Sequence, residues 1–128
     1  MRIKVVTTLL FSFVVCPICF AQTTKQVAKE LVRQGVPHSR IVLAQARLET
    51  GNFTSRRCRE DHNLFGIKHG KRYARYARWQ DSVTDYKIRI SNRYNGKENY
   101  YSFLRRIGYA SDELYIIKIK HIIKTSKH

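Results

Sequence analysis

The sequence has 128 residues, with 25 lysines and arginines against 9 aspartates and glutamates, for a formal net charge of +16. A chain of this length forms one compact domain and is too short for two. Hydrophobic residues make up 43% and charged residues 27%, which excludes a disordered low-complexity chain and a fibrous repeat. The excess of cations predicts an anionic partner: nucleic acid, membrane head groups or an acidic cell-wall glycan.

The start of the sequence is typical of a secretory signal peptide. Arg2 and Lys4 precede an apolar run that ends with the small residue Ala21. A retained transmembrane anchor is the alternative, because this run only just reaches the length needed to span a bilayer. The polar residues that follow favour cleavage. We therefore assign residues 1–21 to the signal peptide and residues 22–128 to one exported domain, located in the periplasm, the cell envelope or the extracellular space, without stable membrane insertion.

Cleavage changes little in the charge and much in the cysteine count. It removes two cations and no carboxylate, so the basic character belongs to the folded domain. It also removes Cys16 and Cys19 and leaves Cys58 alone, so we expect no intramolecular disulfide. Because an exported protein seldom meets chromosomal DNA, we expect no nucleic-acid partner. We expect the domain to act as a monomer.

Apolar periodicity predicts two helices in the first part of the domain. The first contains Val27, Ala28, Leu31 and Val32 and ends at Gly35. The second runs from about residue 39 to Gly51 and is apolar on most sides, so it should be central. The pattern is then lost until about residue 70. Here we expect an ordered loop that leads into a short hairpin around residues 66–79.

Three more helices are expected after the hairpin. One starts at residues 81–85, with Ser82 as the cap and Asp85 as the capping-box acid. A short one ends at Gly108. The last one begins at Ser111, and its inward residues are expected to be Leu114, Ile116, Ile119 and Ile123. The sequence thus predicts an α+β, mostly helical fold of lysozyme size, with a short β-hairpin.

Glu49 is a candidate general acid. It lies at the end of the most hydrophobic expected helix, where the helix dipole does not stabilise a negative charge. If Phe53 and other apolar residues surround it, desolvation should raise its pKa, as a general acid near neutral pH requires. The alternative is a surface carboxylate paired with Arg47, Arg56 or Arg57. The spacing alone leaves both possibilities open.

Four motifs then stand in one family's order. They are residues 43–51 (LAQARLETG), 63–68 (NLFGIK), 79–86 (WQDSVTDY) and 108–112 (GYASD). From about residue 27 to 123, the sequence resembles the bacterial endo-β-N-acetylglucosaminidases of glycoside hydrolase family 73. The resemblance implies a lysozyme-like fold, with the hairpin beside the catalytic cleft. It also implies hydrolysis of the β-1,4 bond between N-acetylglucosamine and N-acetylmuramic acid in peptidoglycan glycan strands, with Glu49 as the catalytic acid.

Further site residues follow from the same motifs. Tyr109 resembles the family's cleft tyrosine, and its hydroxyl is expected to hold a water or the substrate acetamido group. The candidate substrate-binding residues are Gln45, Asn63, Phe65, Trp79 and Tyr115. The Asn63 amide can bond a sugar hydroxyl, and the Phe65 ring can stack on a pyranose. Packing is the alternative for Phe65, Trp79 and Tyr115.

The hairpin departs from the family pattern. Many relatives carry a second acid there, but residues 68–78 contain no carboxylate. The remaining candidates are Glu60, Asp61, Asp81 and Asp85. Three routes stay open: attack by the substrate's own 2-acetamido oxygen while Glu49 protonates the leaving oxygen, an inverting route with water held by Tyr109, and weak or lost activity. The last route would leave a cationic module that only binds wall glycan.

Two other functions have weaker patterns. Residues 72–79 alternate cations with aromatics, as single-stranded nucleic-acid grooves do, but the two kinds mix on both faces of a strand. We therefore expect a solvated hairpin that contacts anionic glycan. Cys58, His62 and His69 are near one another in sequence, yet scattered ligands in a loop are a poor zinc pattern. We expect no metal and no cofactor.

Overall fold

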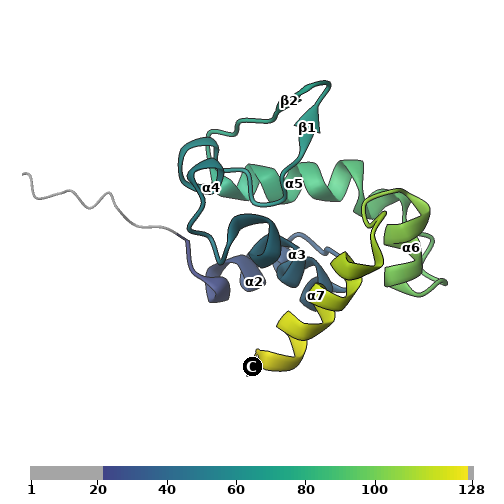
Figure 1. The fold of residues 1–128 in the computed structure, drawn as a ribbon. Coiled ribbons are helices and arrows are strands. Elements are labelled where there is room, and N and C mark those ends of the chain that lie inside the picture. Colours follow the sequence, from purple (N-terminus) through teal and green to yellow (C-terminus); the bar gives the residue numbers. More distant parts are fainter. Residues whose placement is uncertain (1–21, 127–128) are drawn as a thin grey trace, which may run out of the picture.

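The computed structural model describes residues 22–126, so the expected signal peptide, residues 1–21, lies outside the described part. The chain is mostly helical with one small antiparallel sheet, which confirms the predicted α+β class (Figure 1). The elements are α2 (Thr24–Arg33), α3 (Ser39–Thr50), α4 (Arg56–Asp61), β1 (Lys68–His69), β2 (Arg72–Tyr73), α5 (Trp79–Arg89), η3 (Ser91–Arg93), α6 (Tyr100–Arg106) and α7 (Glu113–Thr125). Within residues 22–126, no helix is long and apolar enough to cross a membrane.

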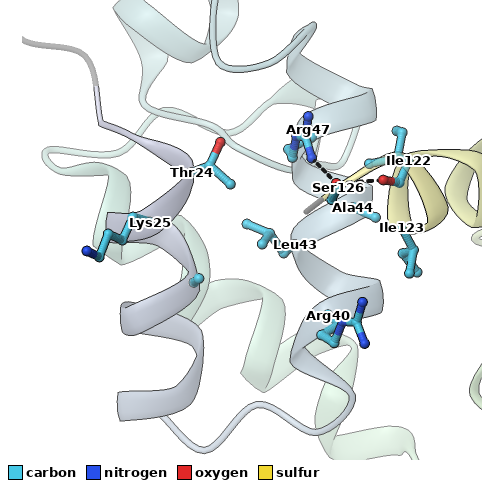
Figure 2. A pocket seen from close by; sticks show the side chains of 10 residues that line it. Thr24, Lys25, Arg40, Leu43, Ala44, Arg47, Ile122, Ile123 and Ser126 are labelled. Atoms are coloured by element: carbon cyan, nitrogen blue, oxygen red, sulfur yellow. Dashed lines mark hydrogen bonds between the residues drawn. The ribbon is translucent and has the colours of Figure 1, made fainter. Parts of the chain in front are cut away.

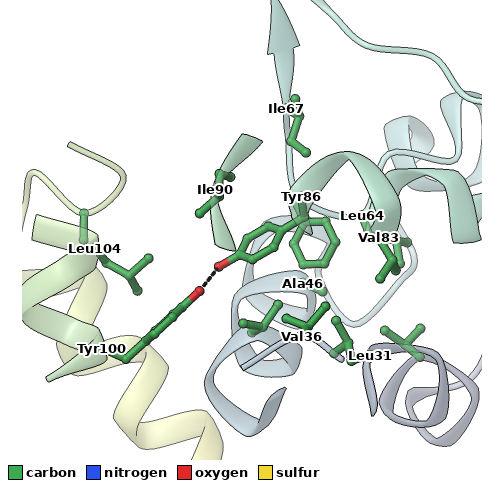
Figure 3. Packing of buried hydrophobic residues seen from close by; sticks show 14 of the residues in the cluster. Leu31, Val36, Ala46, Leu64, Ile67, Val83, Tyr86, Ile90, Tyr100 and Leu104 are labelled. Carbon is green, nitrogen blue, oxygen red and sulfur yellow. Dashed lines mark hydrogen bonds between the residues drawn. The ribbon is translucent and has the colours of Figure 1, made fainter. Parts of the chain in front are cut away.

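Helix α3 is the centre of the fold, as its apolar character predicts. It packs against α2 on one side and α7 on another. Val42, Ala44 and Ala46 are buried on it. The core continues through α5 and α6, where the rings of Tyr86 and Tyr100 are buried among aliphatic side chains (Figure 3). Burial of this apolar surface is what holds the short helices together.

The end of α3 is fixed by its own sequence. Gly51 adopts the left-handed conformation, with φ +57°, that terminates the helix, as predicted. At the residue before Gly51, the Thr50 hydroxyl donates to the carbonyl of Ala46 and accepts the backbone N–H of Phe53. These bonds hold the last turn of α3 and the chain that leaves it. Glu49 lies on that last turn.

The segment between α3 and α5 differs from the prediction. Residues 56–61 form helix α4, which the sequence pattern does not indicate because only Cys58 of this helix is buried. Ser55 caps it by accepting the backbone N–H of Cys58. The hairpin is shorter than expected, with Lys68 opposite Tyr73 as its first pair. Two-residue strands have too little alternation to mark their ends.

The predicted start of α5 is wrong. The helix begins at Trp79, and its N-cap, Arg78, makes no side-chain capping bond. Ser82 is buried inside the first turns and donates to the Trp79 carbonyl. Asp85 reaches the hairpin instead of the helix start: its carboxylate accepts from the His69 ring at 2.7 Å and from the Tyr76 hydroxyl at 2.6 Å. A tertiary contact thus replaces the expected capping box.

Leu114, predicted to be inward, is exposed, and so is Val32 of the first predicted helix. Val32 of α2 is 68% exposed and Leu114 of α7 is 50% exposed. Helix α7 starts one residue after its cap, Asp112, whose carboxylate accepts the Leu114 backbone N–H. Ile116 and Ile119 are buried as predicted. The displaced start places Leu114 at the open edge of the helix.

Candidate active site

Glu49 opens onto a hollow between α3 and the start of α7. This hollow, the Glu49 cleft, has a volume of about 280 Å³ and is lined by Leu48, Glu49, Tyr109, Ser111, Asp112, Leu114, Tyr115 and Lys118. Two predicted site residues, Tyr109 and Tyr115, therefore lie with Glu49 in one cleft. One wall of the cleft is formed by Leu114 and Lys118, two exposed residues of α7.

The backbone of Gly66 lies against the Glu49 carboxylate. A Cβ atom at Gly66 would stand 3.3 Å from Oε2 of Glu49, tighter than most real contacts. Gly66 also has φ +65°, a left-handed conformation that favours glycine. The sequence predicts close approach at Gly66, and the approaching group is the carboxylate of Glu49.

The surroundings of Glu49 favour its protonated form. Burial raises the pKa of the Glu49 carboxyl, and a hydrogen bond with Tyr115 offsets this only in part. By its surface area Glu49 is an exposed residue, so water reaches its side chain from the cleft and the desolvation of the carboxyl is partial. The alternative arginine partners are engaged elsewhere: Arg47 donates to Asn52 and Ser126, and Arg56 pairs with Glu60. No salt bridge to Glu49 occurs within residues 22–126.

Tyr109 and Tyr115 stand side by side in the cleft as neutral phenols. Their ring centroids are 5.9 Å apart, and the Tyr109 hydroxyl donates to the Phe65 carbonyl at 3.0 Å. Burial raises the pKa of both hydroxyls, and the nearby Glu49 carboxylate adds to the effect. Neither phenol therefore ionises near neutral pH. They can hold groups by hydrogen bonds, but they cannot serve as bases.

Gln45 is buried behind the cleft. Its side chain is 0% exposed, with Nε2 donating to the Tyr115 hydroxyl at 3.3 Å and Oε1 accepting from the Tyr86 hydroxyl at 2.6 Å. The Tyr86 hydroxyl also bonds that of Tyr100 at 2.9 Å (Figure 3). Gln45 is thus a positioning residue that fixes the Tyr115 hydroxyl, rather than the sugar contact expected from the sequence.

Comparison with known protein families gives the identity. The family model described as mannosyl-glycoprotein endo-beta-N-acetylglucosaminidase matches residues 24–128. The chain belongs to this glucosaminidase family. The match confirms the resemblance to glycoside hydrolase family 73 and supports, in general terms, a glycoside hydrolase that acts on peptidoglycan. No curated protein and no solved structure matches the chain.

Three of the predicted sugar-binding residues make contacts within the fold. Asn63 is buried, and its amide donates to the carbonyls of Ile67 and Ala74, which joins the two sides of the hairpin base. The Phe65 ring packs in the core, 4.5 Å from the Tyr86 ring. Trp79, the first residue of α5, is partly buried against the core. None of the three lines the Glu49 cleft.

The Glu49 cleft contains a second carboxylate, which the sequence pattern does not predict. Asp112 lines the cleft with Glu49. The GYASD motif places Asp112 in the family pattern, but its position suggested only a helix start. One of its oxygens, Oδ1, accepts the backbone N–H of Leu114 as the α7 cap. Asp112 therefore lies in the same cleft as Tyr109 and also caps helix α7.

The other candidate acids are paired with cations. Glu60 pairs with Arg56, Asp61 with Arg75, Asp81 with Arg78, and Asp85 with His69 and Arg89. None of these acids lines the Glu49 cleft. Each has a salt bridge or hydrogen bonds that explain its presence without catalysis.

A second, larger hollow does not include Glu49 in its lining. It has a volume of about 460 Å³ and lies between α2, α3 and α7 (Figure 2). Leu43, Ala44 and Ile123 give it apolar walls, and Lys25 and Arg40 stand at its edge. Its lining contains no carboxylate, so it offers no general acid for glycoside hydrolysis.

The residues considered for zinc are separate in the structure. Cys58 is buried and its Sγ accepts from the Gln22 amide. His62 bonds the Tyr76 carbonyl through Nδ1, and His69 bonds Asp85. Among residues 22–126, no group of three or more potential ligands gathers for a metal.

Proposed function

We propose that this chain is an exported peptidoglycan hydrolase that cleaves the β-1,4 bond between N-acetylglucosamine and N-acetylmuramic acid, with Glu49 as the general acid. The observation that carries the proposal is the state of Glu49. Its carboxyl opens onto a cleft, its pKa is raised by burial, and no cation neutralises it within residues 22–126. A carboxyl of this kind is protonated at a higher pH than a free one and can give its proton to a leaving oxygen.

The chemistry follows a substrate-assisted route. Glu49 protonates the glycosidic oxygen while the bond from the anomeric carbon to that oxygen breaks. The carbonyl oxygen of the substrate's 2-acetamido group forms a bond to the same carbon. Water then attacks that carbon, opens the cyclic intermediate, and returns a proton to Glu49. Tyr109 and Tyr115 act by holding the acetamido group and the attacking water, since both hydroxyls stay neutral.

The carboxylates of the cleft support this route over a two-carboxylate one. Among residues 22–126, Asp112 is the only carboxylate besides Glu49 that lines the cleft, and it caps α7 from the same wall as Tyr109. The hairpin, which carries the second acid in many relatives, has none in residues 68–78. The substrate's own acetamido oxygen supplies the missing nucleophile.

Replacement of Glu49 tests the assignment. Glu49→Gln should lower the release of reducing ends from purified peptidoglycan by about 100-fold or more, the scale of a lost general acid. Asp112→Asn keeps an oxygen for the α7 cap and should retain most of the activity. Unchanged activity in Glu49→Gln would sink the proposal, whereas loss in both variants would favour two carboxylates.

The anomer released first separates the routes. Substrate assistance retains configuration and gives the β anomer, whereas direct attack by water gives the α anomer, and NMR during the first turnovers distinguishes them. A zymogram in which neither the wild type nor Glu49→Gln clears the wall would favour the second candidate, a wall-binding module without catalysis. The missing hairpin carboxylate is the observation behind that candidate. Export itself is tested by sequencing the N-terminus of the protein recovered outside the cytoplasm, which should begin after Ala21.

A further inference from the structure

Helix α4 and the hairpin carry a group of cations without carboxylate partners. We define the cationic hairpin surface as Arg57 of α4 together with Lys68, Lys71 and Arg72 of the hairpin. None of them takes part in a salt bridge within the described part of the chain. The acids nearby are already occupied: Glu60 by Arg56, Asp61 by Arg75 and Asp85 by His69. The surface is therefore uncompensated and suited to an anionic ligand.

Part of this surface is held in place. The Arg57 guanidinium carbon lies 3.3 Å from the centroid of the Tyr73 ring, and the Lys68 ammonium lies 4.8 Å from it. Attraction between a cation and a ring face orients both side chains. A guanidinium stacked in this way keeps its N–H groups along the rim, where they can bind a carboxylate in a bidentate manner.

The held cations are close to the catalytic carboxylate. Gly66 packs against Glu49, and Lys68 follows only two residues later as the first residue of β1. Two residues span at most about 7 Å of chain. Lys68 pairs with Tyr73 across the hairpin, so the Arg57 and Tyr73 stack adjoins the strand that follows Gly66. None of these cations lines the Glu49 cleft, so a ligand on the cationic hairpin surface would be a group attached to the substrate and not the sugar bound at Glu49.

The chemistry of the proposed substrate identifies the ligand. In the wall, the lactyl carboxyl of each N-acetylmuramic acid is joined by an amide bond to a peptide, so the negative charges lie on the free carboxylates of that peptide. Given the proposed peptidoglycan substrate, on which this inference rests, we propose that the cationic hairpin surface binds the acidic stem peptide next to the scissile bond, with Arg57 and Lys68 as its main contacts. Nucleic acid fits less well, because Arg57 already covers a face of Tyr73 and leaves a poorer platform for a base.

The test compares two substrates. One is purified peptidoglycan stripped of attached polymers. The other is the same glycan after an amidase has removed the stem peptides and the lactyl carboxyls that this exposes have been converted to neutral amides. The double variant Arg57→Gln/Lys68→Gln should raise KM on the peptide-bearing substrate about tenfold, the scale of one charge-assisted hydrogen bond, with kcat unchanged. On peptide-free glycan, the variant and the wild type should have the same KM. A merely structural role for these cations would affect both substrates equally.

A matched control removes the same charge elsewhere. Lys29 of α2 and Lys124 of α7 are exposed and lie on helices away from the hairpin (Figure 1). Lys29→Gln/Lys124→Gln should keep the wild-type KM on the peptide-bearing substrate. An equal rise of KM in both double variants would overturn the inference by assigning the effect to net charge alone.

The outcomes also separate this inference from the proposed function. If Glu49→Gln is inactive but the wild type cleaves both substrates with the same KM, the peptide contact is wrong and the hydrolase assignment stands. If Glu49→Gln keeps its activity, the proposed function itself is wrong. A preference that appears only with unstripped walls would assign the surface to an attached anionic polymer and overturn the peptide contact.

Discussion

Folding and the proposed function place opposite requirements on the side chain of Glu49. Partial desolvation of its carboxyl makes the ionised form less favourable in the folded protein, while the proposed role as general acid requires a proton that stays available. Active-site groups commonly carry such a cost, and removing them stabilises the fold.

The stability of Glu49→Gln should therefore depend on pH. The folded-state pKa of Glu49 lies above its ordinary value of 4.5, so folding favours the protonated form, and the stability this contributes is lost as pH rises through the folded pKa. Compared with the wild type, Glu49→Gln should be more stable at neutral pH and equally stable below the ordinary pKa. Urea unfolding of both proteins across this range measures the difference, and a lower stability of the variant at neutral pH would contradict the raised pKa.

Gly66 is a second residue at which one added atom should affect both stability and activity. Gly66→Ala adds a Cβ that would meet Oε2 of Glu49 at 3.3 Å, in a backbone conformation with φ +65°. We expect a loss of about 1–2 kcal/mol in stability from the left-handed conformation, together with reduced kcat from a displaced carboxylate. The control is Gly70→Ala, which has the same strain at φ +68° but no atom within 4 Å of the added carbon. Equal kcat in the two variants would show that the Glu49 contact is unimportant.

At the scale of elements, Asp85 fastens the hairpin to α5. Its carboxylate accepts from His69 of β1, from Tyr76 after the hairpin, and from Arg89 of its own helix. Burial alone would raise the pKa of Asp85, but these hydrogen bonds outweigh it and hold the pKa below its ordinary value. A two-stranded hairpin is marginal alone in water, so this attachment stabilises its position.

Asp85→Ala should loosen the hairpin and lower the stability. The expected loss at neutral pH is about 1–2 kcal/mol, since the hydrogen bonds are to a charged group that is partly exposed. The folded pKa of Asp85 is depressed, so its contribution is present above the ordinary value of 3.8 and is lost as pH falls through the folded pKa. Urea unfolding at neutral and at acid pH tests this. Asp81→Ala, which breaks only a surface pair with Arg78, is the control and should change little.

Helices α3 and α4 show which parts of the fold can be predicted from the sequence. Helix α3, its end at Gly51 and the position of Glu49 follow from local patterns, because periodicity and a left-handed glycine act within a few residues. Helix α4 does not, because it buries only Cys58. The roles of Gln45 and Asp85 are set by partners far along the chain, such as Tyr115 and Tyr76, which no local pattern reports. The family's motifs located the cleft, but the structure shows which motif residues face it.

At the scale of the whole molecule, charge should govern attachment to the wall. Without the expected signal peptide, which carries two cations and no carboxylate, the formal net charge is +14, and this excess of cations attracts anionic polymers. Binding of the inactive Glu49→Gln variant to purified peptidoglycan should weaken steadily with added salt, because screening shortens to about 8 Å at physiological ionic strength. Co-sedimentation across a salt series measures this. Binding that is unaffected by salt would assign attachment to neutral contacts with the sugars.

The contact between Gly66 and Glu49 also links the position of the hairpin to the protonation state of Glu49. The hairpin begins directly after Gly66, so a hairpin that moved outward would carry this backbone away from the carboxylate and admit water. Hydration would favour the ionised form and release the proton that the leaving oxygen needs. The position of the hairpin would thus affect how strongly Glu49 holds its proton.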